Sequence, residues 1–317
     1  MNIVVLDGHT LNPGDNPWDE VARLGGFVCH DRTPSDLVVP RALGADIVLT
    51  NKTPLPAATI AQLPRLKFIS VLATGYNIVD GAAARARGVP VANVPVYGTD
   101  AVAEYVFALL LNFFRQPQRH SELVHAGEWA RVNEWTFWRT PLSELAGRTL
   151  GIVGFGRIGR RVGEIAAAFK MKVLAADPAH VDPPRYPFAW RELPELFAEA
   201  DVVTLHCNLA PENNGLVNRR LLSRMKPPAY LINTARGPLV NEADLAEALR
   251  RGQLAGAALD VVSAEPLAPD NPLLAAPNIT LTPHIAWATL AARRRLMQAT
   301  AANIAAFLAG QPVNVVN

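Results

Sequence analysis

Arg236, Glu265 and His284 carry side chains that suit anion binding and proton transfer, and each follows a short apolar run. If these runs are strands of an open parallel sheet, the residues just beyond their carboxyl ends line the ligand crevice. His284 could then donate a proton, Glu265 could orient the imidazole, and Arg236 could hold a carboxylate with its fork of N–H donors. Each residue also has an ordinary explanation. A loop arginine is usually solvated, a glutamate before proline often ends an element, and a histidine can simply satisfy hydrogen bonds in a core.

A glycine-rich segment, LGIVGFGRIGRRVGEIAAAF, is the strongest local signal in the chain. Gly154, Gly156 and Gly159 form the pattern G-x-G-x-x-G directly after an apolar strand and ahead of helical spacing. The first glycine permits a tight turn, the second lets a pyrophosphate approach the backbone, and the third lets the helix pack close to the strand. The free N–H groups at the helix start, near Arg157 and Ile158, would face the anion. The segment therefore predicts a site for a dinucleotide.

Asp177 ends the next predicted strand, 18 residues beyond Gly159. A carboxylate at this place accepts hydrogen bonds from the adenosine ribose and repels a 2′-phosphate, so we expect NAD(H) in preference to NADP(H). The ordinary alternative is that Asp177 only caps a turn. A nicotinamide cofactor would explain the presence of Arg236, Glu265 and His284. Hydride transfer to a ketone needs a proton donor for the nascent alkoxide. It needs a cation as well if the substrate carries a carboxylate.

The elements that must position these residues form two series of short β-branched runs, with segments rich in Ala, Arg and Leu between them. This alternation predicts βα units with parallel sheets, and continuous apolar runs suit strands that are buried on both faces. The fold class is therefore α/β with two domains. The strands are expected at residues 2–6, 46–50, 67–72 and 90–94 in the first series, and at 150–153, 173–177, 202–205, 230–233, 257–260 and 278–281 in the second.

Residues 99–114, between the two series, form an apolar helix with little polar face, which must be buried on most sides. The segment that follows has no clear periodicity and holds Trp129, Trp135 and Trp138. Three tryptophans so close together favour a covering partner subunit, and thus a homodimer. The alternative is that they fold back on their own domain.

Composition excludes several classes of protein. The chain has 317 residues, half of them apolar, so intrinsic disorder is excluded; 30 basic and 28 acidic residues give a net charge of +2, too little to attract nucleic acid or an anionic membrane. Cys29 and Cys207 cannot build a structural zinc site, and we expect no metal and two free thiols in a reducing cytoplasm. The longest apolar stretch, 101–111, is too short to span a bilayer, and the N-terminus begins as a strand and not as a signal peptide.

The whole chain resembles the D-isomer-specific 2-hydroxyacid dehydrogenase family. The resemblance lies in the glycine loop, Asp177, the NTARG around Arg236, the DVVSAEPL that contains Glu265 and the PHIAW that contains His284, with gaps of 29 and 19 residues between the last three. It implies that Arg236, Glu265 and His284 are the catalytic set. It also implies a flavodoxin-like substrate domain, 1–98 and 286–317, with a Rossmann-type NAD-binding domain, 99–285, inserted between its parts. The further cofactor contacts that it implies are His206, Thr234, Ala235, Asp260 and Ala286.

Two N-terminal segments match the family's substrate domain. The TNK that contains Asn51 and Lys52, and the ATGYN turn that contains Ala73, Thr74 and Gly75, resemble the glycerate dehydrogenase (hydroxypyruvate reductase) branch. We therefore expect interconversion of hydroxypyruvate and D-glycerate, and of glyoxylate and glycolate, with Arg236 and His284 also contacting the substrate. The family further implies that an aromatic such as Trp138 approaches the partner's active site. Another 2-oxo acid as substrate, or a non-enzymatic NAD(H)-sensing protein on the same scaffold, are the alternatives.

Overall fold

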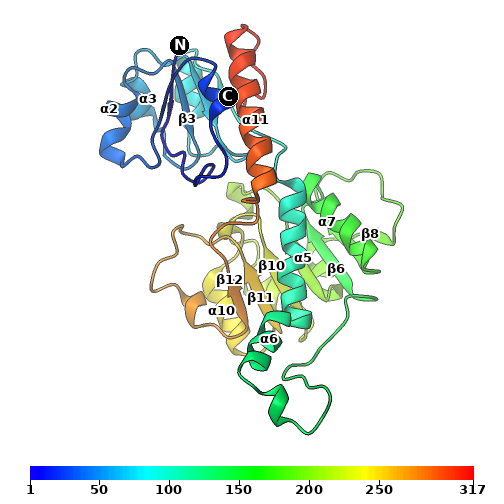
Figure 1. Ribbon diagram of the computed structural model, residues 1–317. Coiled ribbons are helices and arrows are strands. Elements are labelled where there is room, and N and C mark those ends of the chain that lie inside the picture. The colour runs from blue at the N-terminus through cyan, green and yellow to red at the C-terminus, as the bar shows by residue number, and fades with distance from the viewer. The chain divides into compact units, whose positions relative to one another are not determined.

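The computed structural model describes all 317 residues, and the chain divides into two compact units. The terminal unit comprises Met1–Gly98 and Trp287–Asn317, and the central unit comprises Thr99–Ala286 (Figure 1). The second crossing between them thus follows residue 286, one residue later than the sequence suggests. Both units are parallel α/β structures with helices on both faces of a sheet, which is the predicted fold class.

The terminal unit has a five-stranded parallel sheet in the order β2-β1-β3-β4-β5, the flavodoxin-like arrangement. Side chains alternate along each strand, so Val4 and Val48 pack on one face while Ile3 and Ile47 pack on the other. Helices α2, α3 and α4 cover the first face, and α1 and α11 cover the second. The elements are β1 (Asn2–Val5), α1 (Asp19–Ala22), β2 (Gly26–Cys29), α2 (Val38–Ala42), β3 (Ile47–Thr50), α3 (Ala57–Ala61), β4 (Phe68–Val71), α4 (Gly81–Ala86), β5 (Val91–Ala92) and α11 (Leu290–Leu308).

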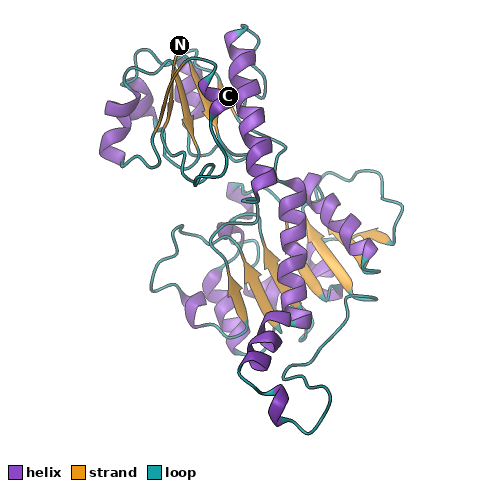
Figure 2. Ribbon diagram, viewed as in Figure 1, coloured by secondary structure: helices purple, strands orange, loops and turns teal.

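The central unit has a seven-stranded parallel sheet in the order β12-β11-β10-β9-β6-β7-β8, which is the Rossmann order with one added strand. Helices α5 and α7 pack on one face, and α8, α9 and α10 pack on the other; Figure 2 shows the strands between these helices. Its strands are β6 (Thr149–Val153), β7 (Lys172–Ala176), β8 (Phe188–Trp190), β9 (Val202–Leu205), β10 (Tyr230–Asn233), β11 (Gly256–Leu259) and β12 (Ile279–Leu281). Its helices are α5 (Thr99–Arg115), α6 (Pro117–His125), α7 (Arg157–Ala168), α8 (Leu193–Glu199), α9 (Arg219–Leu222) and α10 (Glu242–Arg250).

Every strand predicted from the sequence is present, with ends that shift by at most about two residues, the usual uncertainty of such boundaries. Two strands escape the sequence pattern, β2 and β8. Both lie at the outer edge of their sheets, and their residues are only partly buried. An edge strand need not be apolar on both faces, so it lacks the continuous run that marks the others.

Helix α5 forms as predicted, and it buries Ala103, Val106 and Leu110 against the sheet and α7. The tryptophans of the following segment do not fold back onto their own unit, so that alternative is wrong. Trp129, Trp135 and Trp138 are 51%, 84% and 61% exposed in the single chain. No helix of the structure has the length and apolar character needed to cross a membrane.

Candidate active site

The glycine loop joins β6 to α7, and two of its glycines are required by close contacts. Gly154 has a φ of +92°, and a Cβ at this position would strike the backbone of Cys207. A Cβ at Gly159 would strike the carbonyl oxygen of Gly154, so the helix could not begin so close to the strand. Gly156 differs because open space surrounds the place of its missing Cβ, and it caps α7 without a side chain. The loop therefore fits a pyrophosphate that approaches Gly156 and meets the first N–H groups of α7.

Asp177 follows β7, and its carboxylate ties two turns together. One oxygen accepts the N–H of Phe155 at 2.7 Å, and the other accepts the N–H of Ala179 at 2.8 Å. Asp177 therefore does cap a turn, as the alternative interpretation of the sequence expected. Each carboxylate oxygen can accept more than one hydrogen bond, so the ribose contact of Asp177 stays a prediction that this arrangement permits.

His206 follows β9 at the centre of the sheet. The backbone N–H of His206 donates to the carbonyl oxygen of Val153 at 2.7 Å, and the ring Nε2 lies 2.9 Å from the hydroxyl of Thr204. Burial lowers the pKa of His206 to about 3, so its imidazole is neutral at working pH. The Thr234 hydroxyl, in the turn after β10, is buried and has no hydrogen-bond partner. An unpaired buried hydroxyl next to a strand end suits contact with a ligand.

Arg236 stands two residues beyond Thr234, at the start of the 3₁₀ turn Gly237–Leu239. Asn233 is fully buried at the end of β10 and fixes this turn from inside. Its amide N–H donates to the carbonyl of Arg236 at 2.9 Å, and its Oδ1 accepts the N–H of Ala235 at 3.0 Å. The Arg236 guanidinium makes one bond to the carbonyl of Ala235, at 2.7 Å. A guanidinium has five N–H donors, so most of them remain for an anion.

Glu265 and His284 form a direct pair, as the sequence predicts. Glu265 Oε2 lies 2.7 Å from His284 Nδ1, and the two side chains are 34% and 23% exposed. His284 has a φ of +57°, a left-handed conformation that costs roughly 1–2 kcal/mol outside glycine. Surrounding contacts must therefore hold the residue in place. Because Glu265 occupies Nδ1, Nε2 is the ring nitrogen that can exchange a proton with a substrate.

Asp260 supplies most of the contacts that hold the turn after β12. It is 1% exposed, and its carboxylate accepts the Thr282 hydroxyl at 2.7 Å and the N–H groups of Ile285 and Ala286 at 2.9 and 2.8 Å. Its carbonyl oxygen accepts the N–H of His284 at 2.8 Å. The cofactor contacts expected of Asp260 and Ala286 stay predictions, and the structure adds a role that sequence reasoning missed. Since β10, β11 and β12 are neighbours, Arg236, Glu265 and His284 follow adjacent strands at one edge of the sheet.

In the terminal unit, Asn51 and Lys52 follow β3 and are held by Asp7. The Asp7 carboxylate accepts the N–H groups of Asn51, Lys52 and Thr53 at 2.7, 2.5 and 2.7 Å. The buried Asn51 amide donates to the carbonyl of Leu72 at 2.9 Å. Asp7 did not figure among the expected site residues, although an acid just beyond β1 was a signal that could have found it.

The turn after β4 is also fixed internally. Thr74 donates its hydroxyl to the carbonyl of Val94 at 2.9 Å, and the Thr74 carbonyl accepts the Asn93 amide at 2.7 Å. The Ala73 carbonyl accepts the N–H of Val94 at 3.0 Å, while Gly75 is partly exposed. These contacts give the turn a defined backbone, which a carboxylate-binding role would need. No cluster of three or more His, Cys, Asp or Glu side chains in the chain could hold a metal ion.

Residues 107–286 match the model of the NAD-binding domain of D-isomer specific 2-hydroxyacid dehydrogenases. This match covers more than half of the chain and includes the glycine loop and the Glu265–His284 pair. The chain belongs to the D-isomer specific 2-hydroxyacid dehydrogenase family. It is an oxidoreductase of 2-oxo and 2-hydroxy acids, and its cofactor is a nicotinamide dinucleotide.

Two relatives of this dehydrogenase are similar over nearly their whole length. A hydroxypyruvate reductase of Blautia hydrogenotrophica is 48% identical over 322 residues and covers 100% of both chains. A glycerate dehydrogenase of Methylorubrum extorquens is 40% identical over 286 residues, which are 90% of this chain and 89% of the relative. Both fall in the glycerate and hydroxypyruvate branch that the sequence suggested.

Two solved structures of similar fold hold the phosphorylated cofactor. An acyclic imino acid reductase in complex with NADPH and D-Arg superposes with a TM-score of 0.87, at 31% identity over 100% of both chains. An NADPH-dependent glyoxylate/hydroxypyruvate reductase from Sinorhizobium meliloti, in complex with NADP and malonate, has a TM-score of 0.84 and 29% identity, covering 99% of this chain and 96% of the other. Likeness of fold therefore does not decide which dinucleotide this dehydrogenase prefers.

Proposed function

We propose that this dehydrogenase reduces hydroxypyruvate to D-glycerate and glyoxylate to glycolate, with NADH as the preferred cofactor. The observation that carries the chemistry is the 2.7 Å contact between Glu265 Oε2 and His284 Nδ1. The substrate rests on the names of the relatives, a hydroxypyruvate reductase and a glycerate dehydrogenase, and on the TNK and ATGYN segments of the terminal unit.

The roles of the three catalytic residues follow from their chemistry. When bound at the glycine loop, a nicotinamide cofactor would supply the hydride that reduces the carbonyl carbon of the 2-oxo acid. The Arg236 guanidinium binds the substrate carboxylate and polarises the carbonyl oxygen. His284 gives the proton on Nε2 to that oxygen as it becomes an alkoxide, and ionised Glu265 stabilises the imidazolium beforehand. In the oxidative direction, neutral His284 takes the hydroxyl proton.

Cofactor choice rests on Asp177. Its carboxylate stands after β7 beside the glycine loop, where a second negative charge on the ribose would be repelled. Gly154, Gly156 and Gly159, with Arg157 and Ile158, form the pyrophosphate cradle. The remaining cofactor contacts of the proposal are His206, Thr234, Ala235, Asp260 and Ala286.

The terminal unit, under this proposal, is the substrate domain and the central unit is the NAD-binding domain. Asn51 and Lys52, with the Ala73–Thr74–Gly75 turn, would contact the carboxylate and the hydroxyl of the substrate. A pocket with polar groups discriminates strongly in favour of a substrate that carries a matching hydroxyl. The free thiols of Cys29 and Cys207 suit a reducing cytoplasm.

The dehydrogenase is further proposed to be a homodimer. Three exposed tryptophans in one segment form apolar surface that a partner subunit could cover. In such a dimer, an aromatic of this segment, such as Trp138, would approach the partner's active site. Light scattering at micromolar concentration should give the mass of two chains, and a monomeric mass would contradict the assignment.

The proposed reaction is tested by following NADH consumption with a panel of 2-oxo acids: hydroxypyruvate, glyoxylate, pyruvate and 2-oxoisocaproate. Hydroxypyruvate and glyoxylate should give the highest kcat/KM, and NADPH should be the poorer cofactor with each. The substrate assignment would be overturned if pyruvate or 2-oxoisocaproate were preferred about tenfold or more over both hydroxypyruvate and glyoxylate. Binding of NADH without turnover of any member would overturn the reaction itself.

A further inference from the structure

Glu265 stands on a loop that has little apolar support of its own. The loop, residues 261–271, joins β11 to the 3₁₀ turn Pro272–Ala275, and its buried anchors are Val261 and, just beyond it, Leu273. Residues 263–266, which include Glu265, are exposed. A loop of this kind fluctuates unless hydrogen bonds hold it, and yet its Glu265 carboxylate must stay within 2.7 Å of His284 Nδ1.

Glu242, the first residue of α10, holds both ends of this loop. Its Oε1 accepts the N–H of Ser263 at 2.6 Å, two residues before Glu265. Its Oε2 accepts the side-chain amide N–H of Asn271 at 2.7 Å. Asn271 is itself oriented, because its Oδ1 accepts the N–H of Leu273 at 2.9 Å. One carboxylate therefore spans the loop from end to end with two charge-assisted hydrogen bonds.

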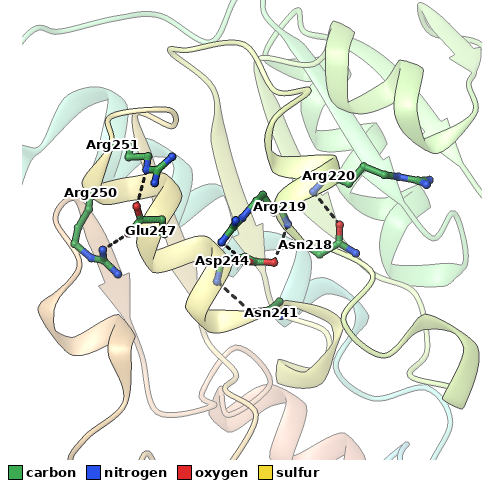
Figure 3. Close-up of polar contacts among 8 residues, drawn as sticks. All are labelled: Asn218, Arg219, Arg220, Asn241, Asp244, Glu247, Arg250 and Arg251. Carbon is green, nitrogen blue, oxygen red and sulfur yellow. Dashed lines mark hydrogen bonds and ion pairs between the residues drawn. The ribbon is translucent and has the colours of Figure 1, made fainter.

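The helix that carries Glu242 is a firm base. The Asn241 side chain caps α10 by accepting the N–H of Asp244 at 3.0 Å, and Asp244 in turn accepts the N–H of Arg219 at 2.9 Å (Figure 3). Leu245 and Leu249 of α10 lie in the core beneath the sheet. The first turn of α10 is thus fixed on both its polar and its apolar side.

A second contact sets the loop against the turn of Arg236. A Cβ at Gly237 would strike the carbonyl group of Val262 and the N–H of Ser263. The peptide that Glu242 holds therefore passes directly over the residue that follows Arg236. Displacing Ser263 would move Glu265 and disturb the surroundings of Arg236 together.

We propose that Glu242 is a positioning residue, which holds the 261–271 loop through Ser263 and Asn271 so that Glu265 stays on His284. This inference rests on the proposed roles of Glu265 and His284. The Glu242 carboxylate accepts its hydrogen bonds from Ser263 and Asn271, so it acts on His284 only through the loop of Glu265. The Asp260 carboxylate also holds the turn of His284, and its contacts go to Thr282, Ile285 and Ala286.

The test exchanges the two hydrogen-bonding partners. Glu242→Gln places an amide N–H against the Asn271 amide N–H, and Asn271→Asp places a second carboxylate against Glu242; each single variant loses one contact. The double variant restores a donor on one side and an acceptor on the other, and its carboxylate can still accept the N–H of Leu273. Glu247→Gln is the matched control, because Glu247 lies on the same helix but pairs with Arg250 and Arg251 at the surface (Figure 3).

The readout is the pH profile of kcat/KM for hydroxypyruvate reduction, with Glu265→Gln measured beside it. Each single variant should lower kcat/KM about 3- to 10-fold on the basic side, which corresponds to the net contribution of one typical hydrogen bond. The basic limb should move to lower pH, as in Glu265→Gln, and the double variant should recover most of both changes. In a protein that already carries Glu265→Gln, the additional substitution Glu242→Gln should not shift the basic limb any further.

Three results separate the possible failures. If Glu265→Gln moves the basic limb but Glu242→Gln behaves like Glu247→Gln, or the double variant recovers nothing, the positioning role is overturned. If Glu265→Gln itself leaves the profile unchanged, the proposed pairing of Glu265 with His284 fails first. A fall in melting temperature without any shift of the limb would assign Glu242 to stability alone and would also overturn the role.

Discussion

At the carboxyl edge of the seven-stranded sheet, the turns after β6, β7 and β9 and those after β10, β11 and β12 position their groups by different means. In the first half, backbone geometry dominates, through the φ of Gly154 and the open space beside Gly156. One side chain adds to it, because the Asp177 carboxylate accepts two backbone N–H groups. In the second half, side chains from separate loops do the positioning, with Asp260 on the turn of His284 and Glu242 on the loop of Glu265.

His206 and His284, which follow β9 and β12, illustrate the difference between the two halves of this edge. His206 lies in the first half, where burial lowers its pKa to about 3, so it stays neutral. His284 lies in the second half, is partly exposed, and has its Nδ1 2.7 Å from Oε2 of Glu265. Both histidines follow a strand at the same edge of the sheet. Of the two, His284 has the Glu265 carboxylate as partner, and the proposal therefore assigns the proton transfer to His284.

The largest expected effect comes from removing the proton donor. His284→Ala should lower kcat/KM for reduction by roughly 10² to 10⁴, the usual contribution of a general acid. The NADH dissociation constant should change little, because the proposal assigns the His284 side chain to the substrate and not to the cofactor. Fluorescence titration with NADH, beside steady-state rates, separates the two. If NADH binding were lost as well, His284 would also support the cofactor, which contradicts its assignment to proton transfer alone.

A smaller effect is expected at Asp177, in the cofactor half. Asp177→Ala removes the charge that opposes a 2′-phosphate, so the preference for NADH over NADPH should narrow by about tenfold, or 1.4 kcal/mol. The pH profile with NADH should keep its limbs. Rates with both cofactors across the pH range provide the check. A parent enzyme that uses both cofactors equally would already remove the basis of this expectation.

The smallest effect is expected at the other histidine. His206→Asn should change kcat by less than about threefold and leave both limbs of the pH profile in place, because a group with a pKa of about 3 does not titrate in the working range. Any change should appear in the KM for NADH. A limb that moved in this variant would show that the chemistry is not confined to the second half.

The sequence predicts the first half of this edge better than the second. Gly154, Gly156, Gly159 and Asp177 fall in one βαβ stretch, and each glycine has a local physical reason that a pattern can carry. Buried strands are likewise visible as continuous apolar runs, whereas the edge strands β2 and β8 are not.

In the second half, resemblance to the family supplied the roles of Arg236, Glu265 and His284, since position alone left ordinary explanations open. The supporting residues Asp7, Asp260 and Glu242 act through hydrogen bonds to segments that are distant in sequence. Asp7 and its partner Lys52 are 45 residues apart, for example. No periodicity records such pairs, so only the folded chain reveals them.

The pH profile of Glu265→Gln tests the central claim most directly. The substitution removes the charge and keeps much of the shape, so protonated His284 loses its stabilising partner. The basic limb of kcat/KM for reduction should then move to lower pH, and oxidation, which needs the neutral imidazole, should extend to lower pH. A profile that superimposes on that of the parent in both directions would contradict the account, even if His284 proved essential.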